Sequence, residues 1–125
     1  MQIPGTLLIV EDEPKIQRFL QSFFELRGLT VYAVGSGEEA LKALSKKPTV
    51  VLLDVNMPGM GGIETLRMIR ATHPKLPVIM ATAVGEEQIV RQALDAGAYD
   101  YVMKPFNLEY LETVVLTKVL LGMEG

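Results

Sequence analysis

Acidic side chains directly follow two of the apolar segments in this sequence. Glu11 and Asp12 come after the segment at residues 6–10, and Asp54 comes after the segment at residues 50–53. Two like charges about 4 Å apart repel by roughly 4 kcal/mol at an effective dielectric constant of about 20, so a cluster of these carboxylates would require a cation. Ligand sets made only of oxygen favour a hard ion, and Mg²⁺ uses few carboxylates. We therefore expect a Mg²⁺ site beside Asp54, whose carboxylate can act as a nucleophile.

A hydroxyl group and an ammonium group follow two further apolar segments. Thr82 comes after residues 78–81, and Lys104 comes after residues 99–103. A threonine hydroxyl can donate a hydrogen bond to a phosphoryl oxygen, and a lysine ammonium is a mobile point charge suited to another. Taken singly, each residue is explained equally well as an ordinary turn, cap or surface residue. Together they predict in-line phosphoryl transfer, which requires mainly positioning and charge neutralisation.

Five apolar segments alternate with five amphipathic ones, and no low-complexity linker separates them. Continuous apolar runs predict strands buried on both faces, and apolar residues at helical spacing predict helices between them. The predicted strands are residues 6–10, 29–34, 50–53, 78–81 and 99–103. Regular alternation predicts one domain over residues 1–125, with a doubly wound α/β fold around a five-stranded parallel sheet. In such folds ligands bind beyond the carboxyl ends of the strands, where the side chains above would meet.

The composition excludes several classes of protein. The chain has no cysteine and one histidine, His73, which excludes disulfides and thiolate metal sites and argues against zinc clusters and Ser-His-Asp hydrolases. A net charge of −3 argues against nucleic acid as the direct partner. No apolar run approaches the roughly 18 residues of a membrane span, and residues 1–5 lack the features of a signal peptide. We expect a cytoplasmic protein that does not insert into membranes.

Four stretches around these segment ends resemble the receiver domains of response regulators. They are Leu8–Glu13, Leu52–Met60, Ala81–Ala83 and Tyr101–Phe106, and Ala96–Ala98 also fits. The resemblance spans the chain and implies a flavodoxin-like (βα)₅ fold with strand order 2-1-3-4-5. It also implies a phosphorylation switch of a two-component system, which receives its phosphoryl group from a histidine kinase or a phosphotransfer protein and acts on an output domain or target protein. Such a domain catalyses only its own phosphorylation and dephosphorylation.

Carried over residue by residue, the resemblance implies a phosphoacceptor and a metal site. Asp54 would be phosphorylated. Glu11 and Asp12 would hold Mg²⁺ together with Asp54, and the backbone carbonyl of Asn56 would complete the protein ligands. Glu13 is expected to face solvent instead.

The same resemblance implies how the switch works. Lys104 would contact the phosphoryl group, and Thr82 would move toward it on activation. Tyr101 would be the switch aromatic, whose ring changes rotamer with the threonine. The bond before Pro105 would be a cis peptide. Tyr99 departs from the family pattern, which often has an acidic residue there, so a charged partner contact at this position is not expected.

The lifetime of a phosphorylated receiver depends on side chains that can position an attacking water. The resemblance to receiver domains implies two flanking positions, two residues after the phosphoacceptor and two residues after the switch threonine, and here they are Asn56 and Val84. An amide can hydrogen-bond such a water, whereas an apolar valine cannot. We therefore expect slower self-dephosphorylation than in receivers with an acidic or amide residue at the second position.

Three alternatives are weighed against this function. A phosphohydrolase that forms an aspartyl phosphate normally carries a second carboxylate two residues after the nucleophile, where this chain has Asn56. A flavodoxin-like cofactor binder would have a glycine-rich phosphate loop after the first strand, whereas Glu11, Asp12 and Glu13 would repel a phosphate. A degenerate receiver should have lost an acidic residue, the lysine or the threonine, and none is lost.

The last helix is apolar on more than one side. Leu108, Leu111, Val115 and Val119 form one stripe, whereas Leu116 and Leu120 lie away from it, with Tyr110, Val114 and Leu121 spreading the apolar surface further. One interpretation is that this helix forms a partner or homodimer face with the fourth helix and the fifth strand. The other is that neighbouring elements bury these side chains.

Overall fold

The apolar segments form the strands of one parallel sheet. The computed structural model describes residues 5–57, 59–83 and 85–122. Its strands are β1 (Thr6–Val10), β2 (Thr30–Val34), β3 (Val50–Asp54), β4 (Val78–Ala83) and β5 (Asp100–Lys104). They are hydrogen-bonded in the order β2-β1-β3-β4-β5, all parallel. The predicted fold class and strand order are therefore confirmed.

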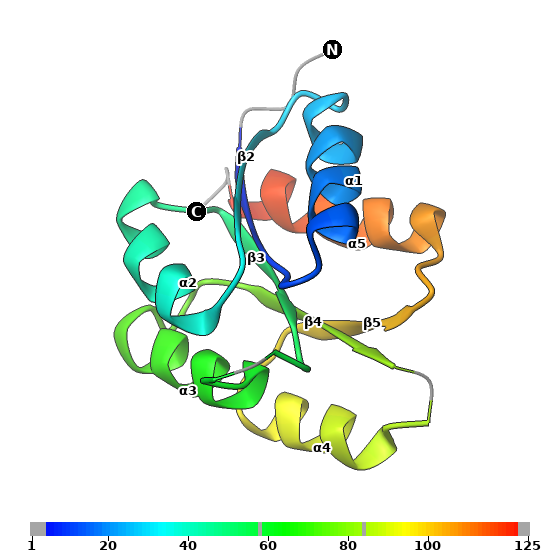
Figure 1. Cartoon of the computed structure of the whole chain (residues 1–125). Coiled ribbons are helices and arrows are strands. Elements are labelled where there is room, and N and C mark those ends of the chain that lie inside the picture. Colours follow the sequence, from blue (N-terminus) through cyan, green and yellow to red (C-terminus); the bar gives the residue numbers. More distant parts are fainter. Residues whose placement is uncertain (1–4, 58, 84, 123–125) are drawn as a thin grey trace.

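Helices cover both faces of this sheet. They are α1 (Pro14–Glu25), α2 (Gly37–Ala43), the short 3₁₀ helix η1 (Leu44–Lys46), α3 (Gly62–Thr72), α4 (Glu87–Asp95) and α5 (Leu108–Gly122). Helices α1 and α5 lie on one face, and α2, α3 and α4 lie on the other (Figure 1). Among the described residues, no helix combines the length and the apolarity that crossing a membrane would require.

Local sequence signals explain where several helices begin. Proline occupies the first position of α1, where its missing N–H is not needed. The hydroxyl of Ser36 accepts the backbone N–H of Glu39 at 3.1 Å, as the capping-box sequence predicts. At α5, Asn107 Oδ1 accepts the backbone N–H of Tyr110 at 3.1 Å.

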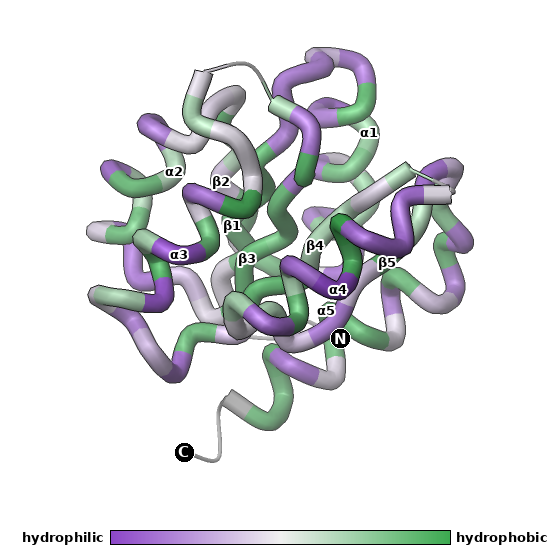
Figure 2. The backbone as a smooth tube through the Cα atoms, turned by 90° about the horizontal axis from the view of Figure 1, so that it is seen from below, coloured by the Kyte–Doolittle hydropathy of each residue, from purple (hydrophilic) through white to green (hydrophobic). Residues whose placement is uncertain are grey.

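The alternation of side chains along the strands divides the core into two layers. Leu7 and Ile9 face α1 and α5, whereas Leu8 and Val10 face α2, α3 and α4. All four side chains are fully buried. Figure 2 shows the hydrophobic strands in the interior, with helices around them that carry hydrophilic residues on their outer surfaces. This burial on both faces fixes the strand register and hence the positions of the strand ends.

Three strands differ from their predicted bounds near the candidate site. Strand β3 includes Asp54, one residue beyond the predicted end, and the other two are β4 and β5. Strand β4 continues to Ala83, so Thr82 lies within the strand and not just after it. Strand β5 runs from Asp100 to Lys104, one residue later than predicted at each end. The reason is their mutual pairing, which extends to Ala83 opposite Lys104. Hydrogen bonding to a neighbouring strand does not depend on an apolar side chain, so hydropathy alone missed this extension.

The apolar side chains of α5 divide between the two interpretations, a partner face and burial by neighbouring elements. Leu111, Val115 and Val119 are buried in the core, as the predicted stripe requires. Leu116 is half-buried and packs against the same core, which agrees with the interpretation that neighbouring elements bury these side chains. Leu120 remains 49% exposed.

Candidate functional site: an acidic cluster at the carboxyl edge of the sheet

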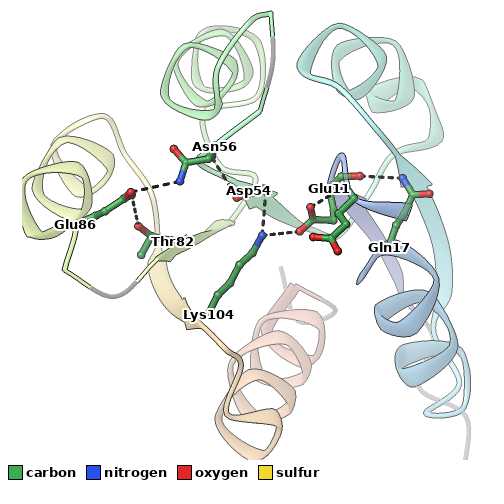
Figure 3. Close-up of polar contacts among 8 residues, drawn as sticks. Glu11, Gln17, Asp54, Asn56, Thr82, Glu86 and Lys104 are labelled. Atoms are coloured by element: carbon green, nitrogen blue, oxygen red, sulfur yellow. Dashed lines mark hydrogen bonds and ion pairs between the residues drawn. The ribbon is translucent and has the colours of Figure 1, made fainter. Parts of the chain in front are cut away.

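Three strands deliver charged side chains to the same edge of the sheet. Glu11 directly follows β1, Asp54 is the last residue of β3, and Lys104 is the last residue of β5. The side chains of these three residues point toward one another (Figure 3). Glu11 is 3% exposed and Asp54 is 4% exposed, so two carboxylates are almost fully withdrawn from water. Burial of this kind requires compensation by charge and hydrogen bonds.

The ammonium group of Lys104 supplies part of that compensation. Its Nζ donates to Oε1 of Glu11 at 2.8 Å and to Oδ2 of Asp54 at 3.1 Å. Burial alone would lower the pKa of Lys104, but hydrogen bonding and attraction to the two carboxylates outweigh it, and the pKa lies above its ordinary value. Lys104 therefore remains charged and is held inside the cluster.

The carboxylate of Glu11 accepts a hydrogen bond at each of its two oxygens. Burial raises the pKa of Glu11 above its ordinary value, and the hydrogen bond from Lys104 offsets this only in part. The backbone N–H of Glu13 donates to Oε2 of Glu11 at 3.1 Å. The side-chain amide of Gln17 donates to the Glu11 carbonyl at 3.1 Å and ties the start of α1 to the site. Gln17 could not be predicted as part of the site, because one glutamine on a helix carries no sequence pattern.

The donor set is suited to a hard cation. Glu11, Asp12 and Asp54 each offer a carboxylate oxygen, and these oxygens lie within 4.8 Å of one another. Asp12 is exposed, so the cluster opens to solvent on its side. Three carboxylates face a single ammonium, which leaves an excess of negative charge for a metal to neutralise. An all-oxygen set with an open side fits Mg²⁺, which keeps several of its waters.

The predicted switch threonine has a carboxylate partner that sequence reasoning missed. Thr82 is 1% exposed, and its hydroxyl donates to Oε2 of Glu86 at 3.2 Å. The side-chain amide of Asn56 donates to the other oxygen of Glu86 at 3.5 Å. The backbone N–H of Asn56 donates to Oδ1 of Asp54 at 3.2 Å. Glu86 lies four residues after Thr82 outside any helix, and no short-range pattern marks such a pair.

The remaining predicted residues lie around this edge, with one exception. Tyr101 is half-buried and lines a cavity of about 220 Å³ together with Gly85 and Glu86. The peptide bond between Lys104 and Pro105 is cis. Val84, the second flanking position for dephosphorylation, lies outside the described residues.

Comparison with known proteins identifies the family. The model of the response regulator receiver domain matches residues 7–116. The chain belongs to this family. Receiver domains are phosphorylation-dependent switches of two-component systems, bind Mg²⁺ at an acidic pocket, and interact with histidine kinases and output domains. The phosphohydrolase alternative is not favoured.

Individual relatives agree with the family match. The receiver is 40% identical over 110 residues to the regulatory protein AtoC of Escherichia coli strain K12, covering 87% of this chain and 24% of AtoC. It is 45% identical over 108 residues to YkoG of Bacillus subtilis strain 168, an uncharacterized transcriptional regulatory protein, covering 86% of this chain and 47% of YkoG. The chain thus spans about a quarter to a half of these curated relatives.

A solved structure has the same fold as this chain. The crystal structure of a putative response regulator from Chloroflexus aurantiacus J-10-fl superposes with a TM-score of 0.87 at 33% identity. The alignment covers 94% of this receiver and 98% of that chain.

Proposed function

We propose that Asp54 is the phosphoacceptor of this receiver. One carboxylate oxygen attacks the phosphorus of a phosphohistidine in a histidine kinase or a phosphotransfer protein. An acyl phosphate forms on Asp54 as the phosphorus–nitrogen bond of the donor breaks, and the electron pair returns to the imidazole. The observation that carries this proposal is the buried Asp54 carboxylate beside Lys104, within the acidic cluster.

Further residues of the cluster would assist this transfer. Mg²⁺ would be held by the carboxylates of Glu11, Asp12 and Asp54 and by the backbone carbonyl of Asn56, and it would neutralise charge on the transferring group. Lys104 already donates to Asp54, so it is positioned to donate to a phosphoryl oxygen attached there.

On the opposite side of the phosphoryl group, we propose two residues that respond to it. Thr82 would turn its hydroxyl toward the phosphoryl group, and Tyr101 would follow into the space beside the start of α4. The cavity that Tyr101 lines supplies room for this movement.

Phosphorylation is tested with a small-molecule donor. Acetyl phosphate with Mg²⁺ should add one phosphoryl group, detected by intact-protein mass spectrometry, and omission of Mg²⁺ should suppress the addition. The nearly isosteric Asp54→Asn variant should remain folded and unmodified. Asp95→Asn, at an exposed aspartate of α4, is the matched control and should be modified like the wild type. Covalent phosphate on a residue other than Asp54 in the wild-type protein would refute the assignment.

We further propose that residues 1–125 act as a single receiver domain in the cytoplasm, with no catalysis beyond its own phosphorylation and dephosphorylation. The partner surface would be formed by α4, β5 and α5. Exposed apolar side chains on or next to these elements support this choice: Leu94, Tyr99, Met103, Tyr110 and Leu120. Such a surface suits an output domain, a target protein or a second copy of the receiver.

A charge placed on that surface should interrupt association. Met103→Lys should reduce any dimer that forms when the receiver is loaded with beryllofluoride and Mg²⁺, measured by sedimentation velocity. Met68→Lys is the matched control, because Met68 of α3 is 41% exposed and lies beside α2 and η1, not on this surface. An identical sedimentation profile for the wild type and Met103→Lys would remove the dimer from this proposal.

The lifetime of the phosphorylated state is also part of the proposal. An apolar residue at position 84 cannot hold an attacking water, and the amide of Asn56 has a partner in Glu86. Val84→Glu should therefore speed loss of phosphate by about tenfold, or roughly 1.4 kcal/mol of barrier. Phosphate loss is timed in both proteins, and an equal or longer lifetime in the variant would contradict the water-positioning account.

A further inference from the structure

Glu86 lies between two side chains that face the phosphorylation site. One oxygen of its carboxylate accepts the Thr82 hydroxyl at 3.2 Å, and the other accepts the Asn56 amide at 3.5 Å. Figure 3 shows Glu86 on the far side of Thr82 and Asn56 from the ammonium of Lys104. Glu86 therefore joins strand β4 to the loop after β3.

The contact between Thr82 and Glu86 uses the only proton that the Thr82 hydroxyl can donate. A hydroxyl has one proton to donate, so Thr82 can donate to Glu86 or to a phosphoryl oxygen but not to both at once. Thr82 is almost fully buried, so bulk water does not readily replace a lost partner. Lys104 differs, because its ammonium already faces Asp54 and carries three protons.

We propose that Glu86 is a positioning residue that holds the Thr82 hydroxyl away from Asp54 until a phosphoryl group displaces it. This inference rests on the proposed role of Asp54 as phosphoacceptor. Glu86 opposes the phosphorylated state in two ways. It competes for the single proton of Thr82, and its negative charge repels the phosphoryl dianion.

The position of Glu86 connects its release to a change at the surface. Glu86 immediately precedes α4 and follows Gly85, whose φ of +92° is a backbone conformation suited to glycine. Its side chain makes no capping hydrogen bond to α4, because the carboxylate is engaged with Thr82 and Asn56. A carboxylate displaced from Thr82 is attracted by the free N–H groups at the start of α4. Release of Glu86 therefore alters the first turn of α4.

The neighbouring cavity links that first turn to strand β5. The cavity of about 220 Å³ is lined by Glu86, Glu87 and Val90 at the start of α4 and by Tyr101 and Met103 of β5. Movement of Glu86 changes one wall of this cavity, and Tyr101 forms another. The contact with Thr82 thus connects the buried site to the proposed partner surface.

The test measures Mg²⁺-dependent binding of beryllofluoride, a phosphoryl mimic, by isothermal titration calorimetry. Glu86→Ala removes both the acceptor and the charge, and it should raise beryllofluoride affinity by about three- to tenfold. Glu86→Gln keeps an acceptor and removes the charge, and it should give a smaller increase. Glu87→Gln is the matched control, because it removes an exposed carboxylate one residue later, and its affinity should equal that of the wild type.

A double-mutant cycle separates action through the hydroxyl from general electrostatics. In a Thr82→Val background, the gain from Glu86→Ala should shrink, because the competition for the Thr82 proton is gone. If Glu86→Ala raises beryllofluoride affinity equally in the wild-type and Thr82→Val backgrounds, Glu86 does not act through the Thr82 hydroxyl and the positioning role is wrong. The role is also wrong if neither Glu86→Ala nor Glu86→Gln changes the affinity. Absence of beryllofluoride binding by the wild-type protein would instead refute the proposed phosphoacceptor site.

Discussion

The side chain of Lys104 extends past the ends of two strands and forms an ion pair with Glu11. Lys104 ends β5 and Glu11 follows β1, with β3 and β4 lying between them, yet Nζ and Oε1 are 2.8 Å apart. The same ammonium also forms an ion pair with Oδ2 of Asp54, at 3.1 Å. One lysine therefore serves as counterion to two buried carboxylates, and both carboxylates are also expected Mg²⁺ ligands.

Competition between this ammonium and Mg²⁺ leads to the first prediction. Lys104→Met removes a positive charge from the cluster, so Mg²⁺ should bind several-fold more tightly, while beryllofluoride should bind more weakly because a donor to the phosphoryl group is lost. Without Mg²⁺ the variant should also unfold at a lower temperature, because buried carboxylates lose their partner. Calorimetric titrations and thermal unfolding measure these effects.

The control for this prediction is Lys75→Met, which removes an exposed lysine in the turn between α3 and β4. Its Mg²⁺ and beryllofluoride affinities should match those of the wild type. Weaker Mg²⁺ binding in Lys104→Met would mean that the ammonium supports the metal site instead of competing with it.

The second prediction distinguishes two adjacent acidic residues. Asp12 belongs to the carboxylate cluster, whereas Glu13 is exposed and contributes only its backbone N–H to Glu11. Asp12→Ala should weaken Mg²⁺ binding by about tenfold or more, and Glu13→Ala should change it little. Isothermal titration with Mg²⁺ alone measures both, and equal losses would show that the loop after β1 is misassigned.

Much of this site could be predicted because the side chains follow apolar strands. A run such as residues 50–53 marks a buried strand, and the parallel arrangement brings the carboxyl ends of all strands to one edge. Asp54 and Lys104 were located by this reasoning alone. Their residue types predict a nucleophilic carboxylate and an ammonium suited to a phosphoryl oxygen, and the resemblance to a known family adds the backbone carbonyl of Asn56 and the switch aromatic Tyr101.

The features that were missed depend on contacts between distant segments. The pairing of Glu86 with Thr82 requires knowledge of how the chain turns between β4 and α4. The extension of β4 to Ala83 depends on hydrogen bonding to β5. Leu116 is half-buried because the core reaches farther around α5 than the apolar stripe indicated. Hydropathy patterns describe one segment at a time and do not contain this information.

The third prediction concerns a close approach of two backbones beneath the site. A methyl group on Gly62 would collide with the carbonyl oxygen of Asp54 and would lie 2.6 Å from Cα of Val55. Gly62→Ala should therefore lower the free energy of unfolding by about 1–3 kcal/mol, although alanine otherwise favours helices. Because the clash involves Asp54, the proposed phosphoacceptor, beryllofluoride affinity should also fall. Urea unfolding and calorimetry measure the two effects.

Gly61 provides a control one residue earlier. A methyl group at Gly61 would meet no atom within 4 Å, and its φ of −67° suits any residue. Gly61→Ala should therefore lower the free energy of unfolding by less than about 1 kcal/mol, because alanine is a weaker N-cap for α3 than glycine. It should leave beryllofluoride affinity unchanged. If the two variants lose equal stability, the close approach at Gly62 does not explain the requirement for glycine there.

The last prediction concerns the pH dependence of metal binding. Burial raises the pKa of Glu11 above its ordinary value of 4.5, so the protonated form persists to a higher pH than in an exposed glutamate. Mg²⁺ requires the ionised carboxylate, and its binding displaces this proton. As pH falls from 7.5, Mg²⁺ affinity should therefore begin to weaken at a higher pH than that at which an ordinary glutamate titrates. Glu11→Gln should bind Mg²⁺ more weakly at pH 7.5 and with a flatter pH profile over the same range. Titrations at several pH values test this, and an equally steep profile in the variant would assign the proton to another group.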